Sequence, residues 1–289
     1  MTEAAALSVP LGQSGSGRLR YGAAMALYGE GKLSAEALEV YRICSSRDAD
    51  DPGALLQERG LPVPKVGSDD ASGAIRLLID EADRYLSALQ GPGLAEARAG
   101  ISAARSGQVR PLPPHETEVV AAYLATALDQ LEKTHAALAS AVAIAAPLLD
   151  WVTYDAYPRD QIGDAFATGH AFASLIGAEA PVVANDFDFG LFLIAPHVLY
   201  RDRCHRASEL YAPLTGPHGW RFGPDTPLVL KPAHVPVWNE PFRPHLTKVG
   251  AVPFLSLFCW TRDVDEPARV LNATDWPGLE ALRIGEGDD

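Results

Sequence analysis

The chain has 289 residues, enough for one large or two modest domains, and its 47% hydrophobic and 21% charged residues are ordinary for a globular protein. The formal net charge is −13, from 24 basic and 37 acidic residues, and no basic stripe is visible. This balance argues against nucleic acid and anionic membranes as partners. It is compatible with a cationic small-molecule substrate, although many soluble proteins without such a substrate are equally acidic.

Three cysteines, Cys44, Cys204 and Cys259, are spread along the chain. An odd and sparse set argues against a disulfide framework and for a reducing compartment, so we expect a cytoplasmic protein. No apolar run reaches the roughly 18–20 residues that a membrane-spanning helix needs. Residues 1–20 lack the basic start and apolar block of a signal peptide, so none is expected.

The first part of the chain has the pattern of amphipathic helices. The run from Gly12 to Gly17 is typical of a flexible linker, so residues 1–19 are predicted to be a flexible leader. Between residues 20 and 110 apolar residues recur at helical spacing, and Ser34 is placed to cap one of these helices. A Pro-rich segment at 105–115 indicates a boundary at the end of this helical region.

Further helices are expected between residues 111 and 180. A long one extends from about Glu116 to Ala146, where Pro147 bends or ends it. Another is predicted from Arg159 to Ile176, because Gly177 follows as a stop signal. We interpret this segment as helices that pack on the domain that follows.

From Pro181 the helical period gives way to short strands separated by Pro, Gly and Asn. The expected strands are 187–195, 210–214, 219–222, 228–230, 235–238, 245–249 and 254–261. Closely spaced strands with turn signals are typical of a sandwich or barrel, which we place at residues 181–270. The acidic tail at 271–289 is expected to be loosely held. The predicted fold class is α+β, with an N-terminal helical region followed by a C-terminal β-barrel.

Two stretches of the predicted barrel carry metal-binding residue types. His205 and Glu209 have metal-ligand spacing if a strand there runs into a turn. His205 and Glu209 alone would more often be a polar surface pair, but His245 lies in a second stretch and adds a third ligand. Two histidines and a carboxylate indicate a divalent metal ion, and mixed nitrogen and oxygen ligation suits zinc, iron, manganese or nickel alike.

These stretches resemble the two motifs of the cupin family, whose barrel is a double-stranded β-helix. The spacing His205-(X)3-Glu209-(X)6-Gly216 matches the later part of the first cupin motif. Pro244-His245 resembles part of the second motif. The resemblance implies a cupin barrel with the metal site inside it.

Within the cupins, the chain is most similar to the dimethylsulfoniopropionate (DMSP) lyases and their lyase-like relatives. Their first motif has a Tyr, then His-x-His, then Glu-x-Tyr, which corresponds to the run from Tyr200 to Tyr211. Their second stretch, with a Trp, prolines and Pro-His, corresponds to the run from Trp238 to His245. The resemblance covers roughly residues 116–265.

One residue departs from the pattern of that family. Arg203 stands where the first His of His-x-His is found, and a guanidinium stays protonated and does not ligate metals. The resemblance then implies three protein ligands, His205, Glu209 and His245, with Tyr211 or water completing the set. Arg203 becomes a candidate contact for the carboxylate of a substrate.

The resemblance implies a metal-dependent lyase that splits a sulfonium zwitterion by β-elimination into dimethyl sulfide and acrylate. The metal would bind the substrate carboxylate and withdraw charge as the carbanion develops. Tyr211 is the candidate base, and Tyr200 would orient the substrate or assist proton transfer. Trp238 and Trp260 would hold the sulfonium by cation–π contact. Because cupins commonly pair through barrel edges or helices, a homodimer is also expected.

Two alternative functions stay open. The barrel could be a cupin enzyme acting on another small carboxylate, as an isomerase or an oxygenase. It could also be a non-catalytic cupin that binds a small ligand, in which case Arg203 would mark the loss of the metal. Other polar residues are given structural roles: Asp186 and Asp188 flank a strand and are interpreted as turn and edge residues.

Overall fold

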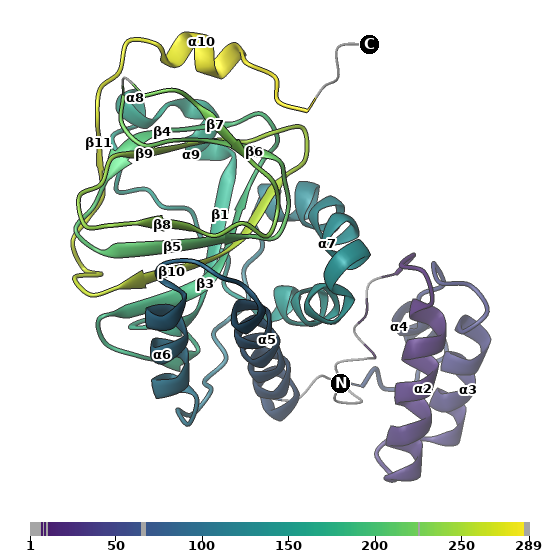
Figure 1. Cartoon of the computed structure of the whole chain (residues 1–289). Coiled ribbons are helices and arrows are strands. Elements are labelled where there is room, and N and C mark those ends of the chain that lie inside the picture. Colours follow the sequence, from purple (N-terminus) through teal and green to yellow (C-terminus); the bar gives the residue numbers. More distant parts are fainter. Residues whose placement is uncertain (1–6, 8, 10, 65–67, 225, 286–289) are drawn as a thin grey trace. The chain divides into compact units, whose positions relative to one another are not determined.

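The structure is a computed structural model that describes Leu7, Val9 and residues 11–64, 68–224 and 226–285. The chain forms two compact units, residues 1–78 with 140–148 and residues 79–139 with 149–289. The helices α5 (Ser68–Ala88) and α7 (Glu118–Ala145) contribute residues to both (Figure 1). The division therefore differs from the predicted boundary at residue 110, since residues 79–110 group with the barrel. No helix of the described residues is long and apolar enough to cross a membrane.

The first unit is helical. It contains α2 (Ser16–Gly29), α3 (Ala35–Cys44), α4 (Pro52–Glu58), the start of α5, the end of α7 and the short η1 (Ala146–Leu148). Ser34 caps α3 as predicted, because its Oγ accepts a hydrogen bond of 3.1 Å from the backbone amide of Ala37. The apolar faces of α2, α3 and α4 form the core of this unit, with the buried residues Ala24, Leu27, Leu33, Ala37, Val40, Tyr41, Cys44 and Leu56.

The predicted leader at 1–19 is too long. Helix α2 already begins at Ser16, and the carboxylate of Asp48 accepts hydrogen bonds from the backbone amides of Gly15 and Gly17 at 2.9 and 2.8 Å. A carboxylate more than thirty residues away thus satisfies amides at the start of this helix. Residues 1–6, 8 and 10 of the predicted leader lie outside the described residues.

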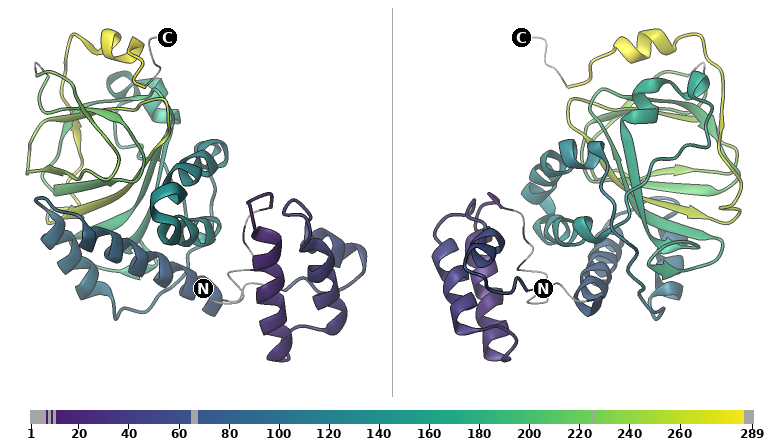
Figure 2. Two further views of the ribbon diagram at one scale, coloured as in Figure 1. Left: turned by 45° about the vertical axis from the view of Figure 1, so that its right-hand side comes forward. Right: turned by 180° about the vertical axis from the view of Figure 1, so that it is seen from behind.

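The second unit is built on a β-barrel of two sheets, which Figure 2 shows from two further sides with α6 (Leu94–Ala104) alongside. One sheet has the strand order β2-β1-β3-β10-β5-β8 and the other β11-β4-β9-β6-β7, and only the pair β1 and β2 is parallel. The first sheet consists of β2 (Val182–Val183), β1 (His170–Gly177), β3 (Phe187–Ile194), β10 (Phe254–Thr261), β5 (Ser208–Pro213) and β8 (Val237–Asn239). The second consists of β11 (Arg269–Val270), β4 (Leu199–Cys204), β9 (His245–Lys248), β6 (His218–Arg221) and β7 (Val229–Lys231). The predicted α+β class with a C-terminal barrel is confirmed.

The helix predicted at 159–176 is wrong in its second half. Two short helices, α8 (Arg159–Ile162) and α9 (Asp164–Thr168), are followed at His170 by strand β1. Gly163 separates the helices with a φ of 88°, a conformation that favours glycine. Strand β1 pairs with β3 along its length, and this pairing overrides the weak helical signal of its sequence.

The barrel interior is rich in aromatic side chains that the two sheets and α9 bring together. Phe166 of α9 is stacked between His170 and Tyr200, with ring centroids 4.0 and 3.8 Å apart. His170 Nδ1 donates to the Phe166 carbonyl (2.6 Å), and its Nε2 accepts from the backbone amide of Tyr154 (2.9 Å). His170 is therefore neutral and joins the segment that carries Tyr154 to the first sheet.

We expect the protein to lose stability as the pH falls from neutral to about 4. Burial lowers the pKa of His170 from 6.5 to about 4 and that of His218 to about 3. Between these values and 6.5 the unfolded chain binds protons that the folded chain excludes, so the free energy of unfolding decreases as the pH falls and is fully retained above 6.5. A pKa difference of about 1 between the folded and unfolded chains corresponds to about 1.4 kcal/mol, so the two groups together cost about 6 kcal/mol near pH 4.

Thermal unfolding followed by circular dichroism across this pH range measures the effect. His218→Asn, which cannot be protonated in this range, should flatten the dependence. A melting temperature that stays constant down to about pH 4 would contradict the assignment of His170 and His218 as buried neutral groups.

The tail predicted to be loosely held at 271–289 is attached in its described part. Helix α10 (Trp276–Ala281) follows Asp275, which pairs with the buried Arg221, and Arg221 also pairs with Asp202. Trp276 Nε1 donates to Asp202 at 2.8 Å, and Lys248 Nζ donates to the backbone carbonyl of residue 280 at 3.1 Å. These contacts join the tail to β6, β4 and β9, and no local sequence pattern shows them. Residues 286–289 lie outside the described residues.

Candidate metal centre and cavity

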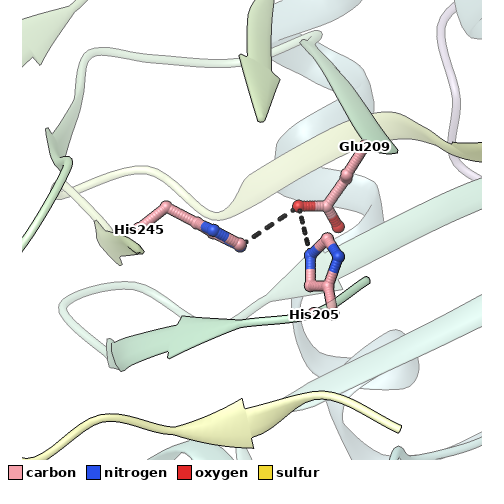
Figure 3. Close-up of side chains that lie close together, drawn as sticks. All are labelled: His205, Glu209 and His245. Atoms are coloured by element: carbon pink, nitrogen blue, oxygen red, sulfur yellow. Dashed lines mark hydrogen bonds and ion pairs between the residues drawn. The ribbon is translucent and has the colours of Figure 1, made fainter. Parts of the chain in front are cut away.

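The three predicted ligands meet inside the barrel (Figure 3). His205 follows β4, Glu209 lies on β5, and His245 begins β9. Glu209 Oε2 lies 3.3 Å from His205 Nε2 and 3.2 Å from His245 Nε2, and all three residues are buried. Within the part of the chain that the structure describes, no other group of three His, Cys, Asp or Glu side chains could hold a metal ion.

Backbone carbonyls set the protonation of both imidazole rings. His205 Nδ1 lies 2.7 Å from the carbonyl oxygen of Ala207, and His245 Nδ1 lies 2.9 Å from that of Arg243. A carbonyl can only accept, so both rings carry their proton on Nδ1. In the neutral form of each ring, the lone pair is then on Nε2 and faces the carboxylate of Glu209.

This arrangement of lone pairs fits a divalent cation. His245 Nε2 is buried and has no hydrogen-bond partner. Burial, with the charge of Arg203, lowers the pKa of His245 to about 4, so its ring is neutral at neutral pH. Two nitrogen lone pairs and a carboxylate at this distance repel one another unless a cation lies among them. In a tetrahedral site with ligand distances of ~2.1 Å, neighbouring ligand atoms lie about 3.4 Å apart, which is close to the two distances from Glu209 Oε2.

Two side chains hold Glu209 in place. Trp260 Nε1 donates to Oε1 at 2.7 Å, and Asn239 Nδ2 donates to Oε2 at 3.0 Å. The strand register explains both, because Glu209 lies opposite Trp260 on β10 and opposite Asn239 on β8. Burial raises the pKa of Glu209, whereas His205 and His245 in their protonated forms would hold it well below 4.5. Trp260, predicted to contact substrate, donates to the predicted ligand Glu209, whereas Asn239 carries no signal in the sequence.

Arg203 lies among tyrosines. Its Nη2 donates to Tyr211 Oη at 3.2 Å, and its Cζ lies 3.2 Å from the centroid of the Tyr200 ring. Its Nη1 donates to the carbonyls of Tyr200 and Arg201 at 3.4 and 3.5 Å. Arg203 is 1% exposed, so protein groups surround its guanidinium. The guanidinium therefore contacts both tyrosines inside the protein.

The charge of Arg203 opposes the effect of burial on the two predicted catalytic tyrosines. Burial raises the pKa of Tyr211 well above 10 and that of Tyr200 to about 12, while the guanidinium lowers both. Tyr200 Oη also shares a hydrogen bond of 2.9 Å with Tyr157 Oη. Arg203 therefore favours the phenolate form of Tyr211, which is the form that could accept a proton.

A cavity of about 160 Å³ adjoins the ligands. Most of its lining residues are aromatic: Tyr154, Tyr157, Phe172, Asp188, Phe192, Tyr200, Glu209, Tyr211, Phe258, Trp260 and Val264. The same cavity is therefore lined by four residues predicted for the site, Tyr211, Tyr200, Glu209 and Trp260. Asp188, interpreted from sequence as an edge residue, lines it as well.

Trp238 does not join the cavity. On β8 its neighbours Val237 and Asn239 are buried, and Asn239 bonds Glu209 inside the barrel, so Trp238 faces the other side of the sheet. Its ring lies against Gly93, where a Cβ atom would come within 2.0 Å of it. Its Nε1 donates to Glu240 at 2.9 Å. The structure therefore separates Trp238 from the other predicted site residues.

Comparisons with known proteins identify the family and the fold. The sequence profile of the dimethylsulfoniopropionate lyases matches residues 97–256, more than half of the chain. One chain from the crystal structures of the DMSP lyases RdDddP and RnDddQII matches with a TM-score of 0.55 and 18% identity, and the match covers 70% of this chain and 100% of that chain. The crystal structure of DMSP lyase DddQ from Ruegeria pomeroyi DSS-3 matches with a TM-score of 0.52 and 20% identity, and the match covers 68% of this chain and 96% of that chain.

A cupin-like protein from Thermotoga maritima MSB8 matches with a TM-score of 0.34 and 14% identity, over 40% of this chain and 86% of that one. No curated protein matches the chain. At these identities the likeness to the two lyase structures shows the fold, and the predicted cupin barrel is confirmed.

Proposed function

The chain belongs to the dimethylsulfoniopropionate lyase family and is a carbon–sulfur lyase, and we propose that its reaction takes place in the cavity beside His205, Glu209 and His245. The reaction is the β-elimination of DMSP to dimethyl sulfide and acrylate. One observation carries the proposal: Tyr211, supported by Arg203, and Glu209 face the same aromatic cavity.

The ligand cluster would hold one end of the substrate. A divalent metal ion bound by His205, Glu209 and His245 supplies Lewis-acid chemistry that withdraws charge from the substrate carboxylate. Trp260 and Asn239 keep the Glu209 carboxylate in position through their hydrogen bonds. Zinc, iron, manganese and nickel all suit this donor set.

Tyr211 would carry the proton step. Its phenolate oxygen, stabilised by the guanidinium of Arg203, accepts the proton from the carbon next to the carboxylate. The electrons of that C–H bond form the new carbon–carbon double bond as the C–S bond breaks, and dimethyl sulfide leaves with the C–S electron pair. Tyr200, bonded to Tyr157, would orient the substrate in the cavity.

The aromatic wall would receive the sulfonium. Trp260, Phe172 and Phe258 line the cavity, and a methylated cation is attracted to such ring faces. Apolar rings also exclude water, which strengthens electrostatic interactions at the reacting atoms. This favours a zwitterion over a plain carboxylate as substrate.

The experiment that tests the function is release of dimethyl sulfide into the headspace by the purified protein, with metal content measured on the same sample. We expect equal amounts of dimethyl sulfide and acrylate, loss of both on chelation, and recovery when metal is restored. Absence of dimethyl sulfide from protein that contains metal would reject the proposed reaction at this site and favour another small carboxylate as substrate.

We expect Arg203→His to retain metal more tightly but to release dimethyl sulfide more slowly. Arg203 lies opposite His245 in the register of β4 and β9, so an imidazole there could join the ligands. Tyr211 would lose its charged donor, and such a hydrogen bond contributes ~1.5–3 kcal/mol, or about 10- to 100-fold in rate. Metal per chain after dialysis and kcat measure the two effects.

A matched control is Arg201→His on the same strand, whose guanidinium pairs with Glu280 at 2.8 Å. It should change neither metal retention nor rate. If Arg203→His were as fast as the parent, Arg203 would have no role in supporting Tyr211.

The cytoplasmic location and the homodimer stay predictions. The dimer is proposed because cupins commonly pair through barrel edges or helices. Sedimentation equilibrium of the full chain tests it, and a monomer at micromolar concentration would reject it.

A further inference from the structure

Asp188 is an acidic residue of the cavity to which the mechanism above assigns no role. It lies on β3 opposite Trp260 of β10, and Trp260 lies opposite Glu209 of β5. All three line the cavity from the same face of the sheet. Two strand spacings of about 4.8 Å place the backbone of Asp188 roughly 10 Å from that of Glu209. The cavity therefore has the metal ligands on one side and a second carboxylate on the other.

Asp188 has hydrogen-bond donors beside it, but none of the groups that shift its pKa is a cation. Its Oδ1 is buried without a hydrogen-bond partner, and the other lining residues on its side of the cavity are aromatic or aliphatic. Burial raises the pKa of Asp188 to about 6, although Ser174 and the backbone amide of Phe189 lower it. A buried carboxylate without a counter-charge is costly, so a bound cation would stabilise this side chain.

We propose that Asp188 pairs with the cationic end of the substrate and makes the cavity selective for a sulfonium or quaternary ammonium zwitterion over an uncharged thioether carboxylate. This assignment rests on the proposed function, because it takes the substrate carboxylate to lie at the metal ligands. A methylated cation has no N–H to donate, so Coulombic attraction and ring faces must recognise it. Asp188 supplies the first, and Phe172, Phe258 and Trp260 supply the second.

The test compares two probes that share a propionate carboxylate. One, 3-(trimethylammonio)propionate, carries a methylated cation, and the other, 3-(methylthio)propionate, is the uncharged thioether. Calorimetry on the metal-loaded full chain should show the cationic probe binding at least about tenfold more tightly to the parent, as a close charge pair of ~1.5 kcal/mol or more implies. In Asp188→Asn, which keeps the shape of the side chain, this ratio should fall at least about tenfold through weaker binding of the cationic probe alone, and the ring faces account for any preference that remains.

The matched control is Asp186→Asn, which removes a carboxylate two residues away that does not line this cavity. Asp186 has a φ of 53°, which Asn tolerates, so the control should keep the selectivity of the parent. Metal content and thermal unfolding verify folding of each variant. Asp188→Ser, with a smaller side chain, should lose selectivity in the same way and serves if the Asn variant does not fold.

Failure of this assignment is distinguishable from failure of the lyase function. If Asp188→Asn still prefers the cationic probe as strongly as the parent, or if the parent shows no preference, Asp188 has no selective role, whatever the parent releases. If the parent prefers the cationic probe, Asp188→Asn loses most of that preference, and no dimethyl sulfide forms, the pairing stands and the reaction is wrong. With DMSP as substrate, the variant should raise KM at least about tenfold with a smaller change in kcat.

Discussion

Tyr211→Phe is expected to release dimethyl sulfide at least about 100-fold more slowly than the parent, because general-base catalysis contributes ~10²- to 10⁴-fold. The variant loses only the phenolic oxygen that accepts a hydrogen bond from Arg203 and lines the cavity. The ligands His205, Glu209 and His245 keep their contacts, so metal content should stay unchanged. Single-turnover release of dimethyl sulfide, with metal measured on the same sample, checks the prediction.

Two further tyrosine variants make this result specific. Tyr200→Phe keeps the ring beneath the guanidinium of Arg203 and loses only the bond to Tyr157, so its effect should be smaller than that of Tyr211→Phe. Tyr85→Phe is the control, since Tyr85 is buried in the same unit but bonds His234 outside the cavity. Full elimination activity in metal-replete Tyr211→Phe would show that another group is the base.

His245→Ala is expected to lose bound metal and elimination activity together. His245 Nε2 has no hydrogen-bond partner and faces Glu209, so the variant leaves only two protein ligands where stable sites have three or four. Metal content after dialysis should fall from about one ion per chain to a small fraction. The rate of dimethyl sulfide release should fall in the same proportion as the metal content, because chains without the metal ion lack its Lewis-acid chemistry and contribute little to the reaction.

Two control variants distinguish the loss of a metal ligand from a general loss of folding. Asn239→Ala removes a hydrogen bond to Glu209 and should weaken metal binding by only about 10- to 100-fold. His234→Ala changes a histidine that bonds Tyr85 and Thr134 away from the ligands and should retain the metal. Metal that stays bound in His245→Ala would place the ion elsewhere in the chain.

The proximity of Glu209 to Tyr211 could be predicted because strand side chains alternate and the motif spacing is local, whereas His245 was joined to them only by the resemblance to a second family motif. Glu209 and Tyr211 are two residues apart on one strand, so they face the same side. The same rule cannot show which strand lies opposite. Asn239 and Trp260 hold Glu209 from strands that are 30 and 51 residues distant in sequence, and only the folded register brings them there.

Residues whose role depends on strand pairing or on distant partners could not be assigned from the sequence. Asp188 has the local pattern of an edge residue, yet its strand is central in the sheet and its side chain lines the cavity. Trp238 has the motif position of a substrate contact, yet it faces out of the barrel. For both side chains, the surroundings depend on which parts of the chain pack on each face of the sheet.

The sequence by itself determined the fold class and placed Tyr211 beside Glu209, because hydrophobic period and motif spacing are properties of short segments, and the resemblance to a family motif added His245 as the third predicted ligand. The tertiary structure decided what Arg203 does: its guanidinium contacts Tyr200 and Tyr211, and a motif comparison shows only that a ligand is missing. It also decided that Asp188 and Glu209 share one cavity. Both outcomes depend on contacts between strands distant in sequence, which form only when the barrel closes.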